Sequence, residues 1–195
     1  MTNLRKLKKR FARERLKVKN NILVKAEEVE LPSWSEKIED FLLSVMELTN
    51  AENQDVSICF CSDDFIKNLN SQYRQIDEST DVLSFELGTE YEGENGESRF
   101  CAGDIVISLA ALERNTKNFS VAIDDELKRL LVHGFLHLEG YDHGQFHIGK
   151  DGAILDEQEK VPVYKDLDEN FKAECDMLIL QEEILYKLSD KKIIE

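Results

Sequence analysis

Apolar residues recur along this chain with two different periods, and each period predicts one kind of secondary structure. Alternating apolar residues and short apolar runs predict strands over residues 21–30, 55–61, 82–87 and 105–107. Apolar residues spaced three and four positions apart predict helices over residues 38–49, 63–69, 109–114, 123–140 and 168–188. The polar, glycine-containing stretches 88–98 and 144–166 are predicted to be loops.

The segment 123–140 gives the strongest helix prediction. Three acids, Asp124, Asp125 and Glu126, lie in its first turn, where the helix dipole favours negative charge. From Leu130 onward almost every side of this helix is apolar, which indicates a central, buried position. Helices and strands are mixed without strict alternation, so we predict an α/β or α+β fold with helices packed on a small mixed sheet.

The composition is that of one ordinary globular domain. The chain has 195 residues, of which 42% are hydrophobic and 33% charged. No apolar stretch is long enough to cross a bilayer, and the basic N-terminus lacks the apolar region of a secretory signal. These features predict a cytoplasmic protein. The four cysteines form no C-x-x-C pair and are interpreted as reduced, partly buried thiols.

The charge is unevenly distributed between two parts of the chain. Residues 1–20 hold nine Lys/Arg and one acid, or about +8, and we interpret them as a basic N-terminal extension. The other 175 residues hold 16 Lys/Arg and 39 acids, or −23, and residues 21–190 are predicted to form a single domain. A net charge of −15 argues against a nucleic-acid partner. Binding depends on local fields, however, so a basic arm on an acidic body can still hold a phosphate chain.

All four histidines lie within residues 133–147. His133 and His137 are four residues apart and therefore lie on one face of the predicted helix. Gly140 is suited to end the helix in the left-handed conformation and lets the chain bring His143 back to the same point. Three imidazoles with one open position are typical of a catalytic zinc site, although nickel or copper also suits them. The alternative, buried histidines satisfied within the core, fits three residues at this spacing poorly.

The spacing H-x3-H-x2-G-x2-H is shared with zinc proteases of the metzincin type. Those enzymes use a glutamate directly after the first histidine as their general base. Gly134 occupies that position here, so no carboxylate acts from it. The pattern therefore argues against peptide hydrolysis, while a divalent metal can still activate water for attack on phosphorus.

The segment 133–143, H-G-F-L-H-L-E-G-Y-D-H, resembles the signature of the YbeY family, the bacterial rRNA maturation factors. Other stretches are also similar to the family: residues 70–85 (N-S-Q-Y-R-Q-I-D-E-S-T-D-V-L-S-F), residues 103–108 (G-D-I-V-I-S), and Met177 with residues 182–185. The histidine motif is highly specific. Together the similar stretches span most of the chain.

The resemblance implies one mixed four-stranded sheet packed by helices, with the histidine helix at its centre. It implies a single-strand-specific, metal-dependent endoribonuclease that acts in ribosomal RNA processing, near the 3′ end of the small-subunit RNA, and in ribosome quality control. The partners that it implies are ribosomal RNA and ribosomal particles, with ribosomal proteins or a GTPase assembly factor. No integral membrane association is expected.

The resemblance also assigns the site residues. It implies one zinc ion on His133, His137 and His143. It also implies that Arg74 and His133 are catalytic, with Arg74 as the functionally important arginine of the cleft. A guanidinium can clamp a phosphate at two points and stabilise developing charge. The alternative for Arg74 is a surface or structural ion pair with one of the many acids.

Several features depart from the family pattern or stay open. Residues 144–166 make a longer connection than usual, and His147 within it is either a fourth ligand or a solvated loop residue. Gln181 stands where a glutamate is common. Asp142 either orients a histidine or caps the turn. The extension 1–20 either grips RNA, contacts a partner or an anionic membrane surface, or is a tail.

Two other functions compete with the endoribonuclease. One is a ribosome assembly factor with incidental nuclease activity, and the other is a metallohydrolase acting on a different substrate, such as a peptide. The sequence also leaves open whether water or the 2′-hydroxyl of RNA is the attacking group, and it reveals no general acid.

Overall fold

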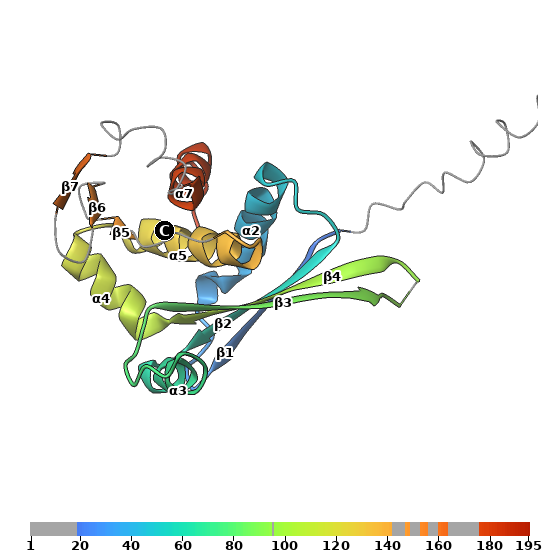
Figure 1. The fold of residues 1–195 in the computed structure, drawn as a ribbon, viewed down its shortest axis with the longest axis horizontal. Coiled ribbons are helices and arrows are strands. Elements are labelled where there is room, and N and C mark those ends of the chain that lie inside the picture. Colours follow the sequence, from blue (N-terminus) through green and yellow to red (C-terminus); the bar gives the residue numbers. More distant parts are fainter. Residues whose placement is uncertain (1–18, 95, 142–146, 149–152, 156–159, 164–175) are drawn as a thin grey trace, which may run out of the picture.

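The computed structural model describes residues 19–94, 96–141, 147–148, 153–155, 160–163 and 176–195. In chain order the elements are β1 (Asn21–Glu27), the 3-10 turn η1 (Ser33–Ser35), α2 (Glu36–Leu48), β2 (Gln54–Cys61), α3 (Asp63–Arg74), β3 (Val82–Glu92), β4 (Ser98–Ser108), α4 (Leu109–Phe119), α5 (Ile123–Leu138), β5 (His147–Ile148), β6 (Ala153–Leu155), β7 (Lys160–Val163) and α7 (Asp176–Lys187) (Figure 1).

The main sheet has four strands in the order β1-β2-β4-β3. Strand β2 pairs parallel with both β1 and β4, and β3 pairs antiparallel with β4. The two parallel pairs are joined through helices, whereas β3 and β4 form a hairpin, as each kind of pairing requires. This mixed sheet, with five α-helices among the described residues, confirms the predicted α+β class.

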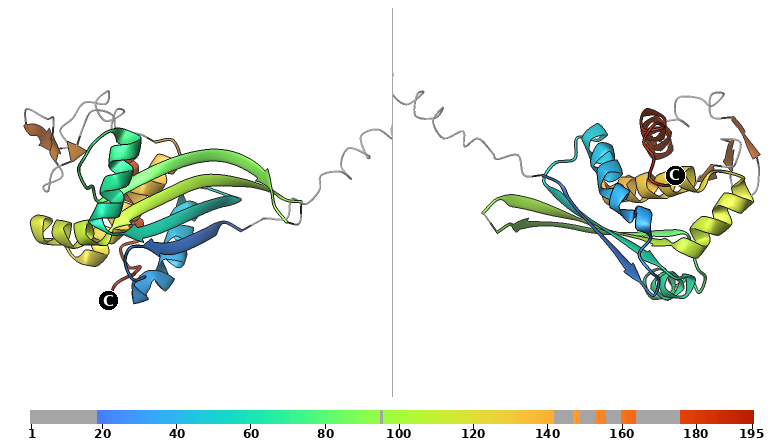
Figure 2. Two further views of the ribbon diagram at one scale, coloured as in Figure 1. Left: turned by 90° about the horizontal axis from the view of Figure 1, so that it is seen from below. Right: turned by 180° about the vertical axis from the view of Figure 1, so that it is seen from behind.

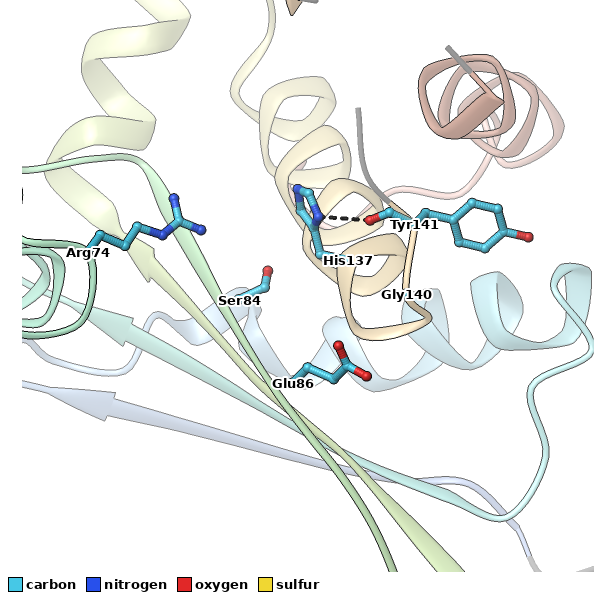
Figure 3. A pocket seen from close by; sticks show the side chains of 6 residues that line it. All are labelled: Arg74, Ser84, Glu86, His137, Gly140 and Tyr141. Atoms are coloured by element: carbon cyan, nitrogen blue, oxygen red, sulfur yellow. Dashed lines mark hydrogen bonds between the residues drawn. The ribbon is translucent and has the colours of Figure 1, made fainter. Parts of the chain in front are cut away.

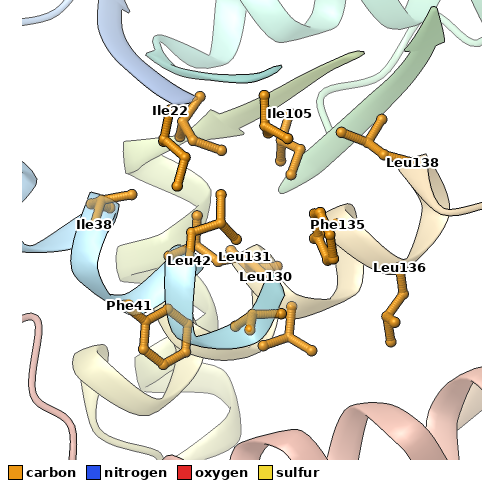
Figure 4. Close-up of a cluster of buried hydrophobic side chains, with 14 of the residues drawn as sticks. Ile22, Ile38, Phe41, Leu42, Ile105, Leu130, Leu131, Phe135, Leu136 and Leu138 are labelled. Atoms are coloured by element: carbon orange, nitrogen blue, oxygen red, sulfur yellow. The ribbon is translucent and has the colours of Figure 1, made fainter. Parts of the chain in front are cut away.

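The helices are divided between the two faces of the sheet. Helix α3 lies on one face, and α2 and α5 lie on the other, with α7 packed against α5 (Figures 1 and 2). The apolar residues of α5 reach both the sheet and α7, and Leu131 and Phe135 are fully buried (Figure 4). The predicted central position of this helix is therefore confirmed. Among the described residues, no helix has both the length and the apolar surface to cross a bilayer.

The two loop predictions are partly wrong. Strands β3 and β4 extend through much of 88–98, and Gly88, with φ 57°, lies at a register shift between Glu86 and Thr89. Glycine here marks an irregularity within a strand, a context that composition does not distinguish from a loop. In 144–166, β5, β6 and β7 form a small antiparallel sheet. The predicted start of the last helix, at residue 168, lies outside the described residues.

The three described cysteines agree with the prediction of reduced thiols. Cys59, Cys61 and Cys101 are free, and the first two are buried beneath α3. Burial raises the pKa of the Cys61 thiol to about 12. A thiol that stays protonated at neutral pH is a poor nucleophile and metal ligand. Cys175 lies outside the described residues.

A buried carboxylate anchors the C-terminal segment to α5. The Asp124 Oδ1 atom accepts hydrogen bonds from the backbone amides of Ile193 and Ile194, both at 2.8 Å. Its Oδ2 atom lies 3.1 Å from the buried Lys128 ammonium. Burial raises the pKa of Asp124, but the two amides and Lys128 outweigh this and bring the pKa below its ordinary value. The residues that follow α7 are thereby fixed to the helix that carries the histidines.

We expect Asp124→Asn to lower the free energy of unfolding at pH 7 by about 3 kcal/mol, because Lys128 loses its buried partner. The folded-state pKa lies below the ordinary value of 3.8, so the carboxylate stabilises the protein above that pH. This stabilisation is lost as the pH falls through the folded-state pKa. Urea unfolding should therefore show a smaller difference in unfolding free energy between wild type and Asp124→Asn at pH 3 than at pH 7. The control is Asp125→Asn, whose side chain is 60% exposed, and an equal loss there would contradict the assignment.

Candidate metal centre

His133 and His137 point their Nε2 atoms at each other from one face of α5. The two atoms are 3.2 Å apart, and both rings are half-buried. A tetrahedral zinc ion with Zn–N bonds of about 2.0–2.1 Å places two ligand nitrogens about 3.3 Å apart. The separation of this histidine pair therefore matches that of two ligands on one ion.

The outer nitrogen of each ring faces an oxygen. His137 Nδ1 lies 3.0 Å from the Tyr141 carbonyl oxygen, and His133 Nδ1 lies 3.0 Å from Gln181 Oε1. The Gln181 amide nitrogen donates to Glu182 at 3.1 Å, which orients the amide with its oxygen toward His133. Both Nδ1 atoms are thus placed to donate, and each Nε2 then carries a lone pair. Two lone pairs at 3.2 Å repel unless a cation lies between them, so these residues fit a divalent metal.

Gly140 creates the turn that holds His137. Its φ of 81° lies in the left-handed region, as predicted from the sequence. The Gly140 amide donates to the His137 carbonyl, and the Tyr141 amide donates to the Leu136 carbonyl, both at 3.0 Å. This pair of hydrogen bonds is the Schellman motif that ends many helices. The motif places the Tyr141 carbonyl against the His137 ring, so the glycine that ends the helix also orients the histidine.

A pocket of about 410 Å³ opens beside His137 and is lined by Arg74, Ser84, Glu86, Gly140 and Tyr141. Arg74 is the last residue of α3 and reaches across toward His137, while the Tyr141 ring points away from the other lining side chains (Figure 3). Helix α3 ends there because Gln75 adopts the left-handed conformation, with φ 63°. Three elements, α3, β3 and α5, therefore meet at this pocket.

Arg74 is exposed, and within the described part of the chain it forms no ion pair. Lys67, two turns earlier on the same helix, pairs with Asp77 at 3.5 Å. Arg129, one turn before His133, hydrogen-bonds to the buried Glu126 carboxylate at 2.6 and 2.9 Å. The described residues thus do not support the alternative of a structural ion pair for Arg74. Its guanidinium is available to an anion in the pocket.

Gly134 lies where helix α5 approaches the sheet most closely. A Cβ atom at this position would lie 2.7 Å from Ile105 Cγ2 and 3.2 Å from Ser84 Oγ. The Ser84 hydroxyl donates to the Gly134 carbonyl at 3.2 Å, which links the helix to β3. The position after the first histidine therefore lies tightly against the sheet, with Ile105 as its nearest neighbour.

The other predicted ligands fall outside what the structure describes. His143 and Asp142 are not among the described residues, and only the backbone of His147 is described, in β5. Within the described residues, no group of three or more His, Cys, Asp or Glu side chains is arranged to hold a metal. The three-histidine site and the role of His147 stay predictions.

The model of the Endoribonuclease YbeY family matches residues 19–163 of this chain, about three quarters of its length. The chain belongs to the YbeY family. This confirms the resemblance and the enzyme class predicted from the sequence. The match covers β1 to β7, and thus Arg74 and the histidine helix.

The YbeY relatives come from several bacterial groups. The chain is 58% identical to Endoribonuclease YbeY of Treponema denticola over 107 residues, which are 55% of this chain and 69% of that protein. It is 41% identical to Endoribonuclease YbeY of Treponema pallidum over 139 residues, which are 71% of this chain and 87% of that protein. A solution structure from Thermotoga maritima has a TM-score of 0.47 at 24% identity and covers 87% of this chain and 92% of that one.

Sequence reasoning missed several residues that the structure places at this YbeY site. Ser84 and Tyr141 lie in family-like motifs, but the sequence assigns neither of them a role. Nothing local in the sequence points to Glu86, although strand alternation places it on the same side of β3 as Ser84. For Gln181 the sequence shows only a departure from the family. Its contact with His133 joins residues 48 positions apart, and no local pattern predicts such a contact.

Proposed function

We propose that this YbeY family member is a zinc-dependent endoribonuclease that cleaves single-stranded RNA. The observation that carries the proposal is the pair of Nε2 atoms 3.2 Å apart, each on a ring whose other nitrogen faces an oxygen. His143 is proposed as the third ligand, because it follows the Gly140 turn closely in the chain. We take zinc as the metal because imidazole ligands suit it.

The chain's own residues have separate tasks in the proposed reaction. A bound zinc ion would act as a Lewis acid at a phosphate group of the RNA. Arg74 would bind the same phosphate with its planar guanidinium and stabilise the charge that develops during displacement. Gln181 and the Tyr141 carbonyl would hold His133 and His137 in the orientation that binding requires.

A single strand suits this pocket better than a duplex. The pocket of about 410 Å³ lies between Arg74 on α3 and His137 on α5. A flexible single strand can bring one phosphate and its neighbouring sugars between these residues, whereas a duplex holds its backbone in a fixed helical shape. We therefore expect cleavage of unpaired segments and little cleavage of the same sequence in a duplex.

We further propose ribosomal RNA as the substrate, with action near the 3′ end of the small-subunit RNA and in ribosome quality control in the cytoplasm. Ribosomal particles, with their proteins or a GTPase assembly factor, would be the partners. The family to which the chain belongs supports this assignment. Residues 21–190 would form the catalytic domain, with 144–166 as an extended connection. The basic residues 1–20 would offset the repulsion between RNA and the acidic body.

Peptide hydrolysis is disfavoured by a specific observation. Gly134 occupies the position of the peptidase glutamate and faces Ile105 and Ser84 in the sheet. Any side chain at this position would meet Ile105, whose Cγ2 atom lies 2.7 Å from the added Cβ, so a glutamate would displace the core. An assembly factor with incidental nuclease activity would still bind ribosomal particles after losing Arg74, so particle binding and RNA cleavage should be measured side by side.

We expect Arg74→Ala to lower kcat/KM on a defined single-stranded RNA by roughly 10²–10³-fold, the effect of removing one group that stabilises transition-state charge. Metal content should not change, because Arg74 is not a proposed ligand. Arg74→Lys should recover only part of the activity, since an ammonium lacks two-point geometry. The matched control is Lys67→Ala, which removes another cation of α3. Activity of Arg74→Ala within twofold of wild type would refute the role of Arg74.

The attacking group is identified by a separate measurement on the cleaved RNA. A cyclic phosphate on the product would identify the 2′-hydroxyl as the attacking group.

A further inference from the structure

We infer that Gln181 is the positioning residue of the metal centre: its amide oxygen orients His133 and thereby sets the affinity of the site for its metal. This inference rests on the proposed function. Gln181 lies on α7, beyond residues 19–163 that match the family model, so neither the match nor the histidine motif assigns it a role.

The geometry around Gln181 is that of a buried, oriented acceptor. The residue is 3% exposed, and its Oε1 atom lies 3.0 Å from His133 Nδ1. Its amide nitrogen donates to Glu182 Oε1 at 3.1 Å. Glu182 in turn attracts Arg129, which lies one turn before His133 on α5. The amide therefore has one favourable orientation, with its oxygen toward the histidine.

An acceptor on the outer nitrogen changes a histidine ligand in two ways. It fixes the ring angle, so the inner nitrogen points at the metal before the metal arrives. It also polarises the ring and makes the inner nitrogen a better donor, and losing such a partner typically weakens metal binding by roughly 10- to 100-fold. His137 receives the same support from the backbone carbonyl of Tyr141, which no substitution removes. Gln181 supplies it to His133 through a side chain, and the contribution is therefore open to a direct test.

The position of Gln181 depends on how α7 docks. Met177 and Ile184, on the same helix, are each 1% exposed within the main core. The segment after α7 is fixed to α5 through Asp124. Both anchors hold α7 independently of Gln181. Replacing the glutamine with a side chain of similar shape should therefore change the metal site without releasing the helix.

The test measures zinc affinity by chelator competition and the melting temperature of the metal-free protein. Gln181→Met keeps the length of the side chain and removes the acceptor, and we expect zinc affinity to fall roughly 10- to 100-fold while the metal-free melting temperature holds or rises. Gln181→Glu restores an acceptor with a full charge. This carboxylate would lie beside Glu182, so the metal-free protein should melt lower and zinc should bind at least as tightly as in wild type.

The control is Gln54→Met, which removes another buried glutamine. Gln54 is buried and donates to Glu139 at 2.8 Å, whereas Gln181 contacts His133, so zinc affinity of Gln54→Met should stay within twofold of wild type. Zinc affinity of Gln181→Met within twofold of wild type, or an equal loss in Gln54→Met, would overturn the inference. If Gln181→Met fails to fold, weaker zinc binding by Gln181→Glu than by wild type would overturn it. Failure of the proposed function looks different, because the wild type itself would then bind no zinc or would keep its affinity in His133→Ala.

Discussion

Replacing His137 with alanine is expected to remove the bound metal and the nuclease activity together. Elemental analysis should find about one metal ion per wild-type chain and almost none in the variant, since two remaining imidazoles bind much more weakly than three. Cleavage of single-stranded RNA should fall by at least about 10³-fold. Losing the ion removes more charge stabilisation than losing a single donor, which lowers the rate roughly 10²–10³-fold.

The variant should fold normally, so this loss is specific. His137 is half-buried on a helix, and alanine is the best helix former. Tyr141→Ala is the matched control for metal content, because it removes a pocket side chain and keeps the carbonyl that faces His137 Nδ1. Equal metal content in His137→Ala and wild type would refute the metal centre. Activity that survives without metal would refute its part in catalysis.

The histidine helix was predictable from the sequence because its features are local. A four-residue spacing places His133 and His137 on one face, and Gly140 is the residue that a left-handed helix end favours. The structure reproduces both, with the Nε2 atoms 3.2 Å apart and φ 81° at the glycine. The central position of α5 followed from apolar residues on almost every side. None of these inferences required knowledge of another part of the chain.

The parts that were missed depend on contacts between distant segments. Gln181 meets His133 only because α7 docks on α5. Arg74 was expected in the cleft from the family resemblance alone, since it lines the pocket with His137 only because α3 and α5 approach the same edge strand, β3. The outer half of the β3–β4 hairpin was also missed. Its residues are mostly exposed and polar, so they lack the apolar alternation that predicts a strand, and pairing with the opposite strand holds them extended.

Gly134 shows how one residue carries both a functional and a structural meaning. From the sequence, it is the position where a peptidase glutamate is absent. In the structure, it is the point where α5 touches the sheet, and a Cβ atom there would lie 2.7 Å from Ile105 Cγ2. Ile105 is fully buried and branched at Cβ, so it has little freedom to move aside. The glycine is therefore required by the packing of α5 against the sheet, which positions the helix that carries His133 and the pocket-lining His137.

We expect Gly134→Ala to lower the free energy of unfolding by about 1–3 kcal/mol, as overpacking of a core does, even though alanine is favoured over glycine in a helix. Gly134→Glu should destabilise the protein further, because a longer, charged side chain would be forced against the buried Ile105. Urea unfolding of the metal-free variants measures both effects, and a protease assay should find no peptidase activity in either. Gly140→Ala is the control: no atom lies within 4 Å of its added Cβ, so only the left-handed backbone opposes it, by roughly 1–2 kcal/mol. A stably folded Gly134→Glu that cleaves peptides would show that this position faces the pocket after all.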